Sequence, residues 1–259
     1  MSRAKTDPSP LRDERRQAVG EKDYRAALAA AFEQGPGSTY ERLEHFPKYV
    51  SRQTLARYLA LGEIFRLALD VHGSIVQCGV NHGGSLLLFA QLSAILEPVN
   101  LQRRIFGFDT FSGFPGIARQ DRKRGAASPQ ARAGGYAGGS RAELEQCVSL
   151  FDRNRFVGHV PKVALVEGDA TKTIPRFVQD NPELVVSLLH LDFDLYEPTL
   201  AALRHFVPRI PKGGVIVFDE LNNAAWPGET RAVHEALGLS ALRIRRLPYE
   251  PHISYCVVE

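Results

Sequence analysis

The sequence predicts an α/β fold built on a mostly parallel sheet. Short apolar runs rich in Val, Ile and Leu alternate with segments of helical periodicity, which is the pattern of strand–helix–strand units. Two of these runs, at residues 184–189 and 215–218, lead directly into acidic residues. Because ligands of open parallel sheets bind beyond the carboxyl ends of the strands, we expect a binding or catalytic site there.

Length and composition are those of an ordinary globular protein. The 259 residues, of which 44% are hydrophobic, suffice for one α/β domain with additions. No stretch approaches the roughly 20 apolar residues of a membrane span, and the polar N-terminus is not a secretory signal. The net charge of +3 is too small to indicate a nucleic-acid partner. Three widely spaced cysteines without metal-site pairing fit a reducing compartment, so we expect a cytoplasmic protein without membrane partners.

The N-terminal part reads as an addition to the sheet domain. Residues 1–20 are polar and charged, and we expect a flexible tail there. Residues 21–72 form a predicted helical extension with helices at 23–34 and 51–71, the second capped by Ser51. The segment between these helices reads as a loop.

Residues 73–259 carry the alternating pattern of the sheet domain. The final two strands are joined by a short turn, so we expect them to form an antiparallel hairpin on the edge of the sheet. The predicted strands are 74–78, 104–108, 163–166, 185–191, 214–218, 242–247 and 253–258, and the predicted helices are 85–96, 171–179, 198–206 and 229–237.

One long segment interrupts this alternation. Residues 112–142 contain seven glycines and six Lys or Arg, but a single acid, Asp121. Loops of this length are commonly lids or disordered insertions. Because the segment follows a strand on the ligand-binding edge, we favour a basic lid over a solvated insertion without a role.

The acidic residues after two strands are the first candidate site. Asp192 and Asp194 follow one strand, while Asp219 and Glu220 follow another. If the strands are neighbours, these carboxylates converge, and they can then hold a hard cation or transfer protons. Asp194 is two residues from Asp192, so it faces the cluster only if the strand has already turned. A general base and a helix-capping acid are equal alternatives for it. His190 is a reserve base.

A second group of residues indicates an adenosine pocket. A glycine-rich turn at 77–85 joins the first strand to its helix, where the backbone can approach a ligand closely. Asp109, at the end of the second strand, is placed to accept hydrogen bonds from ribose hydroxyls, and Asp169 from an adenine amine. The turn lacks the G-x-G-x-x-G spacing and the Walker lysine of diphosphate-binding loops. This favours S-adenosylmethionine over NAD as the cofactor.

Five motifs together resemble the macrocin O-methyltransferase family. These enzymes are class I methyltransferases that use S-adenosylmethionine and magnesium to methylate sugar hydroxyls in antibiotic and polysaccharide pathways. The resemblance implies a Rossmann-like, seven-stranded, mostly parallel sheet. The motifs are VQCGVNHGGS (76–85), FDTFSGFP (108–115), EGDATKTIP (167–175), LHLDFDLYEPT (189–199) and FDELNNAAWPGET (218–230).

The resemblance also implies roles for individual residues. Asp192 or Asp194 would take the hydroxyl proton. Gln77 stands where the family usually has an acid, and Glu220 where it often has Asp, so Glu220 is the weakest metal candidate. The implied metal ligands are Asp192, Asp219 and Glu220, and the implied cofactor-binding residues are Gln77, Gly79, Val80, Ser85, Asp109, Thr110, Asp169 and Ala170.

The expected substrate is a deoxyhexose. The pattern is most similar to members acting on sugars such as rhamnose, and we expect the 3-hydroxyl of a nucleotide sugar such as dTDP-rhamnose to be methylated. The basic side chains of the lid would then meet the diphosphate. Methylation of a sugar already attached to a glycoside or polysaccharide remains an alternative, as does an oxidoreductase or metal-dependent hydroxylase on the same sheet. We also expect a homo-oligomer. The basic lid residues are Arg119, Arg122, Lys123, Arg124, Arg132 and Arg141.

Overall fold

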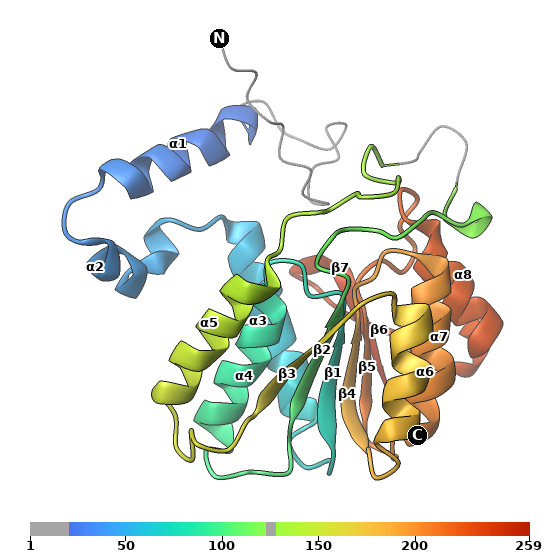
Figure 1. Cartoon of the computed structure of the whole chain (residues 1–259). Helices are drawn as coiled ribbons and strands as arrows, with labels where there is room; N and C mark the ends of the chain where they lie inside the picture. Colours follow the sequence, from blue (N-terminus) through green and yellow to red (C-terminus); the bar gives the residue numbers. More distant parts are fainter. Residues whose placement is uncertain (1–20, 123–127) are drawn as a thin grey trace. The chain divides into compact units, whose positions relative to one another are not determined.

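The computed structural model describes residues 21–122 and 128–259 (Figure 1). The chain divides into two compact units, residues 1–59 and 60–259. This division falls inside a helix. The predicted boundary between a helical extension and the sheet domain, at residue 72, stays a prediction. The predicted tail, residues 1–20, lies outside the described residues.

The first unit contains short helices. The helix α1 spans Glu21–Gln34, α2 spans Thr39–Glu44 and the 3-10 helix η2 spans Phe46–Lys48. The helix α3, Arg52–Leu67, begins in this unit and ends in the second. As predicted, Ser51 caps α3, because its hydroxyl accepts a hydrogen bond from the Thr54 amide at 3.1 Å.

The helix α2 corrects the prediction of a loop between α1 and α3. Ser38 and Glu41 form a capping box: the Glu41 amide donates to the Ser38 hydroxyl at 3.2 Å, and the Ser38 amide donates to the Glu41 carboxylate at 2.6 Å. This pairing satisfies two amides at the start of a helix. The S-x-x-E signal is present in the sequence, but the following apolar pattern is too short to reveal a helix.

The second unit is built on a seven-stranded sheet with the order β3-β2-β1-β4-β5-β7-β6. Strand β1 pairs in parallel with β2 and β4, and β4 pairs in parallel with β5. Strands β7 and β6 form the predicted antiparallel hairpin at one edge. The strands are β1 (Ser74–Cys78), β2 (Ile105–Asp109), β3 (Val163–Glu167), β4 (Val186–Leu191), β5 (Val215–Phe218), β6 (Arg245–Leu247) and β7 (Glu250–Val257).

Helices cover both faces of this sheet, and a separate apolar core lies on each side. One core joins the second half of α3 to α4 and α5, and the other joins α6, α7 and α8 to the opposite face (Figure 1). Every residue of β1, β4 and β5 is buried, as expected for central parallel strands. These helices are α4 (Gly84–Leu96), α5 (Arg141–Arg153), α6 (Ala170–Asp180), α7 (Tyr196–Phe206) and α8 (Pro227–Ala236).

The helix α5 is not among the helices expected from the sequence. Ser140 caps it by accepting a hydrogen bond from the Glu143 amide at 3.3 Å, and Leu144 and Phe151 bury its apolar side. The helix directly follows the polar, glycine-rich insertion, which hides its start. The predicted lid therefore ends where α5 begins. None of the described helices is long and apolar enough to cross a membrane.

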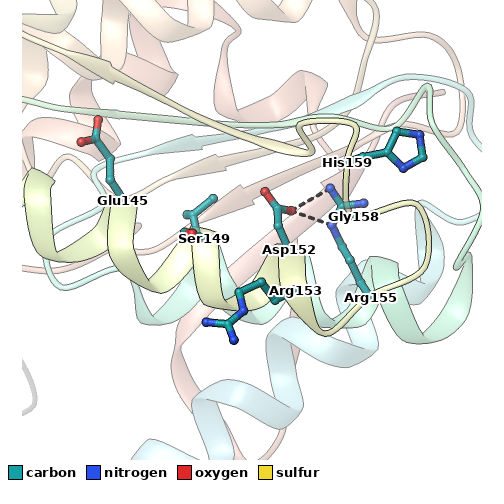
Figure 2. Close-up of a pocket in the computed structure, with 8 residues that line it drawn as sticks. Glu145, Ser149, Asp152, Arg153, Arg155, Gly158 and His159 are labelled. Carbon is teal, nitrogen blue, oxygen red and sulfur yellow. Dashed lines mark hydrogen bonds and ion pairs between the residues drawn. The ribbon is translucent and has the colours of Figure 1, made fainter.

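A surface hollow of about 630 Å³ lies along α5 and the turn that follows it (Figure 2). Its lining contains acidic and basic side chains, and Arg155 donates to the Asp152 carboxylate at 2.7 Å. None of its lining residues is among the predicted catalytic, cofactor-binding or metal-binding residues.

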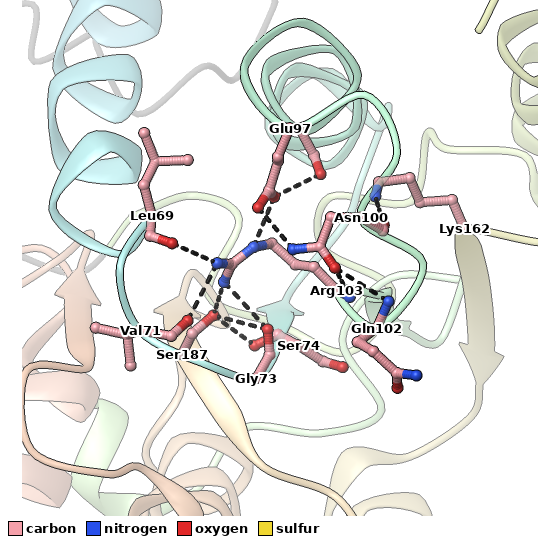
Figure 3. Close-up of polar contacts among 11 residues, drawn as sticks. Leu69, Val71, Gly73, Ser74, Glu97, Asn100, Gln102, Arg103, Lys162 and Ser187 are labelled. Atoms are coloured by element: carbon pink, nitrogen blue, oxygen red, sulfur yellow. Dashed lines mark hydrogen bonds and ion pairs between the residues drawn. The ribbon is translucent and has the colours of Figure 1, made fainter. Parts of the chain in front are cut away.

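A buried arginine ties several segments together at the opposite end of the sheet (Figure 3). Arg103 is 3% exposed, and its guanidinium forms an ion pair with Glu97 at 2.6 Å. It also donates to the Ser187 hydroxyl on β4 and to backbone carbonyls at Leu69 and Gly73. One side chain thus holds the end of α3, the entry to β1, and β4 in register.

Candidate active site at the carboxyl edge of the sheet

The glycine-rich turn and the first acidic cluster meet at the centre of the sheet. Gly79 has a φ of +89°, and a Cβ built there would lie 2.0 Å from the Asp192 carbonyl oxygen. Only glycine tolerates this backbone shape and this close approach. The Asp192 amide also donates to the Cys78 carbonyl at 2.8 Å. The turn that follows β1 and the acids that follow β4 therefore line one volume.

The acids after β4 and β5 converge, as predicted from the neighbouring strands. Ligand atoms of His190, Asp192 and Asp219 all lie within 4.8 Å of one another. The His190 Nε2 atom is 3.5 Å from an Asp219 carboxylate oxygen. His190, which the sequence analysis treats only as a reserve base, thus stands in the group. Glu220 is not one of its three members among the described residues.

Hydrogen bonds orient the His190 ring. Its Nδ1 atom lies 2.6 Å from the Gln77 side-chain oxygen, and the Gln77 amide nitrogen donates to the Gly79 carbonyl at 2.7 Å. Because that oxygen can only accept, Nδ1 carries a proton. The Nε2 atom then faces Asp219. It presents a lone pair when the ring is neutral and a second N–H when the ring is protonated. Gln77 is 1% exposed, and its side chain is bonded within the protein to His190 and Gly79. Its expected contact with the cofactor stays a prediction.

Asp194 turns back toward the acidic cluster. Its φ of +61° is left-handed, so the chain has already turned and the side chain does not face away as in an extended strand. Burial raises the pKa of its carboxyl well above the usual value, and the charges of Glu220 and Asp192 add to this. The cap residue of α7 is Leu195, which has no side-chain capping bond. Asp194 therefore does not cap α7, and the general-base alternative stays a prediction.

Glu229, from α8, is a fully buried carboxyl that the sequence analysis missed. It is 0% exposed and accepts a hydrogen bond from the Glu220 amide at 2.8 Å. Burial raises the pKa of Glu229 well above its usual value, and the Glu220 and Asp219 charges raise it further. The Glu220 carboxylate accepts a hydrogen bond from the Asn223 side chain. Glu229 belongs to the motif at 218–230, but it is the first residue of the predicted helix 229–237, which gives it no expected role of its own.

Asp109 stabilises the glycine-rich turn. One carboxylate oxygen accepts hydrogen bonds from the Val80 and Asn81 amides at 2.7 and 2.8 Å, and the other accepts from the Phe111 amide at 2.8 Å. The neighbouring Thr110 hydroxyl donates to the Gly113 carbonyl at 2.6 Å. Asp109 thus sits at the predicted edge and shapes the turn that would hold a cofactor.

The remaining predicted cofactor residues also lie at or beside this edge. Asp169 caps α6 by accepting from the Thr171 amide at 3.0 Å. Burial raises the pKa of Asp169, but hydrogen bonds from Thr171 and the nearby Lys172 outweigh it and leave the pKa below its usual value. Ala170 is the first residue of α6, and Ser85 is the second residue of α4. Their contact with a cofactor stays a prediction.

Three aromatic side chains from the insertion and the β5–α8 loop pack beside the acids. The Tyr136 ring centroid lies 5.5 Å from that of Phe114 and 5.8 Å from that of Trp226. The Tyr136 hydroxyl is buried and has no hydrogen bond of regular geometry among the described residues. Burial raises its pKa, as do the charges of Asp194 and Glu220, whereas Ser128 lowers it slightly. The hydroxyl therefore keeps its proton and remains a donor.

The described parts of the insertion cover the glycine-rich turn. The Phe114 amide donates to the Gly135 carbonyl at 3.0 Å, which pairs the two arms of the insertion. A Cβ at Gly139 would lie 2.0 Å from the Asn81 carbonyl oxygen, so the second arm rests on the turn. Arg141 forms ion pairs with Glu145 and Glu167 at 2.8 and 2.7 Å. Lys123 and Arg124 of the predicted basic lid lie outside the described residues.

The strand order, with an antiparallel β7 beside β5, and the glycine-rich turn after β1 define a class I methyltransferase fold, as predicted. The sequence profile described as macrocin-O-methyltransferase (TylF) matches residues 59–237. The chain therefore belongs to the macrocin O-methyltransferase family and is an O-methyltransferase that depends on S-adenosylmethionine.

Solved structures support this assignment. A crystal structure of CalS11, a calicheamicin methyltransferase, is 36% identical, with a TM-score of 0.88 over 93% of each chain. An apo structure of CalS11, described as a TDP-rhamnose 3'-O-methyltransferase of calicheamicin biosynthesis, is 34% identical, with a TM-score of 0.80 over 95% of this chain and 99% of that one. The O-methyltransferase NovP is 20% identical, covers 79% of this chain and 80% of its own, and shares the fold at a TM-score of 0.60.

A curated relative matches a shorter stretch. It is the 8-demethyl-8-(2,3-dimethoxy-alpha-L-rhamnosyl)-tetracenomycin-C 4'-O-methyltransferase of Streptomyces olivaceus, 29% identical over 155 residues. The match covers 60% of this chain and 55% of that relative's length.

Proposed function

We propose that this enzyme methylates a hydroxyl of a deoxyhexose carried on a nucleotide, such as the 3-hydroxyl of dTDP-rhamnose, in natural-product biosynthesis. The observation that carries the proposal is the convergence of His190, Asp192 and Asp219 beside the glycine-rich turn. This arrangement supports a cation site next to the expected methyl donor. The proteins described above as acting on TDP-rhamnose and on a rhamnosyl group support the choice of sugar.

The donor set fits a divalent cation. Two carboxylates suit Mg²⁺, which completes its coordination with water and substrate oxygens. An imidazole ligand suits Zn²⁺ or Fe better than Mg²⁺. We therefore assign Asp192 and Asp219 as Mg²⁺ ligands. Glu220 lies outside the group formed by His190, Asp192 and Asp219, and is the weaker candidate for a ligand. The cation, when bound, lowers the pKa of a sugar hydroxyl and orients it.

The protein residues perform the rest of the reaction. The sugar oxygen attacks the sulfonium methyl in line; the new C–O bond forms as the C–S bond breaks, and S-adenosylhomocysteine leaves. The hydroxyl proton passes to a carboxylate, Asp194 or Asp192. The left-handed turn at Asp194, which directs it toward the cluster, supports this role. Phe114, Tyr136 and Trp226 exclude water from the same volume.

One assay tests the proposal. The full-length enzyme is incubated with labelled S-adenosylmethionine, Mg²⁺ and either dTDP-rhamnose or a phosphate-free rhamnoside. We expect transfer to dTDP-rhamnose at a kcat/KM at least tenfold higher than to the rhamnoside. Equal kcat/KM values for the two acceptors would contradict the nucleotide-sugar proposal and favour methylation of an attached sugar. Size-exclusion chromatography with light scattering tests the expected homo-oligomer separately.

A further inference from the structure

Four residues from two elements line a second hollow of about 650 Å³. The first three belong to η3 (Arg119–Asp121) and the residue that follows it, and the fourth belongs to α8. The two elements pack against each other in the second unit (Figure 1). The lining residues are Arg119, Gln120, Arg122 and Arg231.

A buried carboxylate holds this hollow in shape. Asp121 is 1% exposed and accepts hydrogen bonds from the Tyr196 amide at 2.6 Å and the Ala118 amide at 2.9 Å. A Cβ at Gly228 would lie 2.1 Å from one of its oxygens, so η3 fits closely against the start of α8. Arg231 donates to the Gln120 carbonyl and joins the two elements. The arginines therefore project from a fixed backbone.

The positive charge of the hollow is only partly compensated, because one buried carboxyl, Asp121, attracts Arg231. Arg119, Arg122 and Arg231 are exposed, and within the described chain none of them forms an ion pair with a carboxylate. Arg141, Arg176 and Arg204, by contrast, each have a carboxylate partner. Three guanidinium groups carry more positive charge than the one buried carboxyl beside them can balance, so they favour an anion. Arg binds phosphate through two parallel hydrogen bonds.

The hollow borders the acidic site. Tyr196, whose amide binds Asp121, is two residues beyond Asp194. On α8, Gly228 faces Asp121 while the next residue, Glu229, binds the Glu220 amide. The same short stretch of α8 thus touches both the cationic hollow and the acids. A ligand that reaches the acids with a neutral part can place an anionic part in the hollow.

We propose that Arg119, Arg122 and Arg231 bind the diphosphate of the nucleotide-sugar substrate, an inference that rests on the function proposed above. Arg231 comes from α8 and not from the insertion, and Arg141 is committed to its own ion pairs. The diphosphate binds in the hollow, which leaves the sugar to enter the acidic site. The arrangement selects a sugar diphosphate over an uncharged glycoside.

The test compares Arg231→Ala and the double variant Arg119→Ala/Arg122→Ala with Arg176→Ala. Arg176 is an exposed arginine on α6, paired with Asp180 at 3.5 Å, and serves as the matched control. We expect the KM for dTDP-rhamnose to rise about tenfold or more in the hollow variants, with kcat changed by less than about threefold. Calorimetry should show the same loss of affinity for dTDP alone. Slow turnover of a phosphate-free rhamnoside should be unchanged.

The outcomes separate the two proposals. If the native enzyme uses dTDP-rhamnose but the hollow variants keep its KM and their affinity for dTDP, the diphosphate site is refuted and the proposed function stands. If inorganic pyrophosphate competes with dTDP-rhamnose in the native enzyme but not in Arg231→Glu, the hollow binds the diphosphate. Failure of the native enzyme to methylate any nucleotide sugar would remove both proposals.

Discussion

At the scale of single residues, the site is a group of carboxyls whose mutual repulsion a bound cation would relieve. Asp192, Asp194 and Asp219 follow two adjacent strands, and Glu229 adds a buried carboxyl from α8. The raised pKa values of Asp194 and Glu229 have the same cause: burial first, then neighbouring negative charge. In the folded protein these two groups hold their protons to higher pH than free carboxyls do.

Replacing Asp192 with Ala should separate metal binding from cofactor binding. Turnover should fall at least a thousandfold, because Asp192 is both a proposed ligand and a possible base. Calorimetric binding of S-adenosylmethionine should change little. The melting temperature of the native enzyme should rise on adding Mg²⁺, and that rise should vanish in the variant. Asp180→Ala, on the exposed side of α6, is the control. Near-normal methylation by the Asp192 variant in the presence of EDTA would overturn the metal assignment.

Tyr136 offers a buried donor beside the acids. If its hydroxyl binds a substrate oxygen, Tyr136→Phe should lower kcat/KM for the sugar about three- to tenfold, the effect of one hydrogen bond. The loss should fall on the sugar and leave the KM for S-adenosylmethionine unchanged. Tyr249→Phe is the control, because the Tyr249 hydroxyl donates to Glu63 on the surface. Equal kinetics for native and Tyr136→Phe enzymes would make the tyrosine a packing residue only.

At the scale of elements, the site depends on how closely the β1–α4 turn approaches the end of β4. Gly79→Ala should place a methyl group against the Asp192 carbonyl and force a left-handed backbone on alanine. We expect a loss of about 2–4 kcal/mol in the free energy of unfolding, together with weaker cofactor binding. Gly116→Ala is the control, because its Cβ would meet nothing within 4 Å. Urea denaturation of both variants measures the difference.

At the scale of the whole second unit, Arg103 stabilises the fold through buried polar contacts, in addition to the two apolar cores. Its charge is buried and compensated by Glu97 and several carbonyls at the end of the sheet opposite the site (Figure 3). Arg103→Ala should therefore lower the free energy of unfolding by about 3–5 kcal/mol, because it leaves Glu97 with an unpaired charge. The neighbouring Arg104 is exposed, and Arg104→Ala should cost less than about 1 kcal/mol. A similar urea midpoint for both variants would contradict this role.

The sequence by itself determined the strand–helix alternation, the edge hairpin and the two acidic clusters. These features depend on local apolar periodicity and on residues adjacent in the chain, such as Asp192 after β4 and Asp219 after β5. The sequence pattern could not reveal α2 or α5, because the apolar pattern of α2 is too short and α5 directly follows a glycine-rich insertion that hides its start.

Only the tertiary structure decided which residues join the clusters. His190 faces Asp219 because Gln77, on the neighbouring strand, holds its ring. Glu229, Tyr136 and Arg231 come from segments distant in the chain, and only packing brings them to the same edge. Local sequence sets secondary structure through short-range contacts, whereas a site assembled across strands depends on register and on the path of the loops.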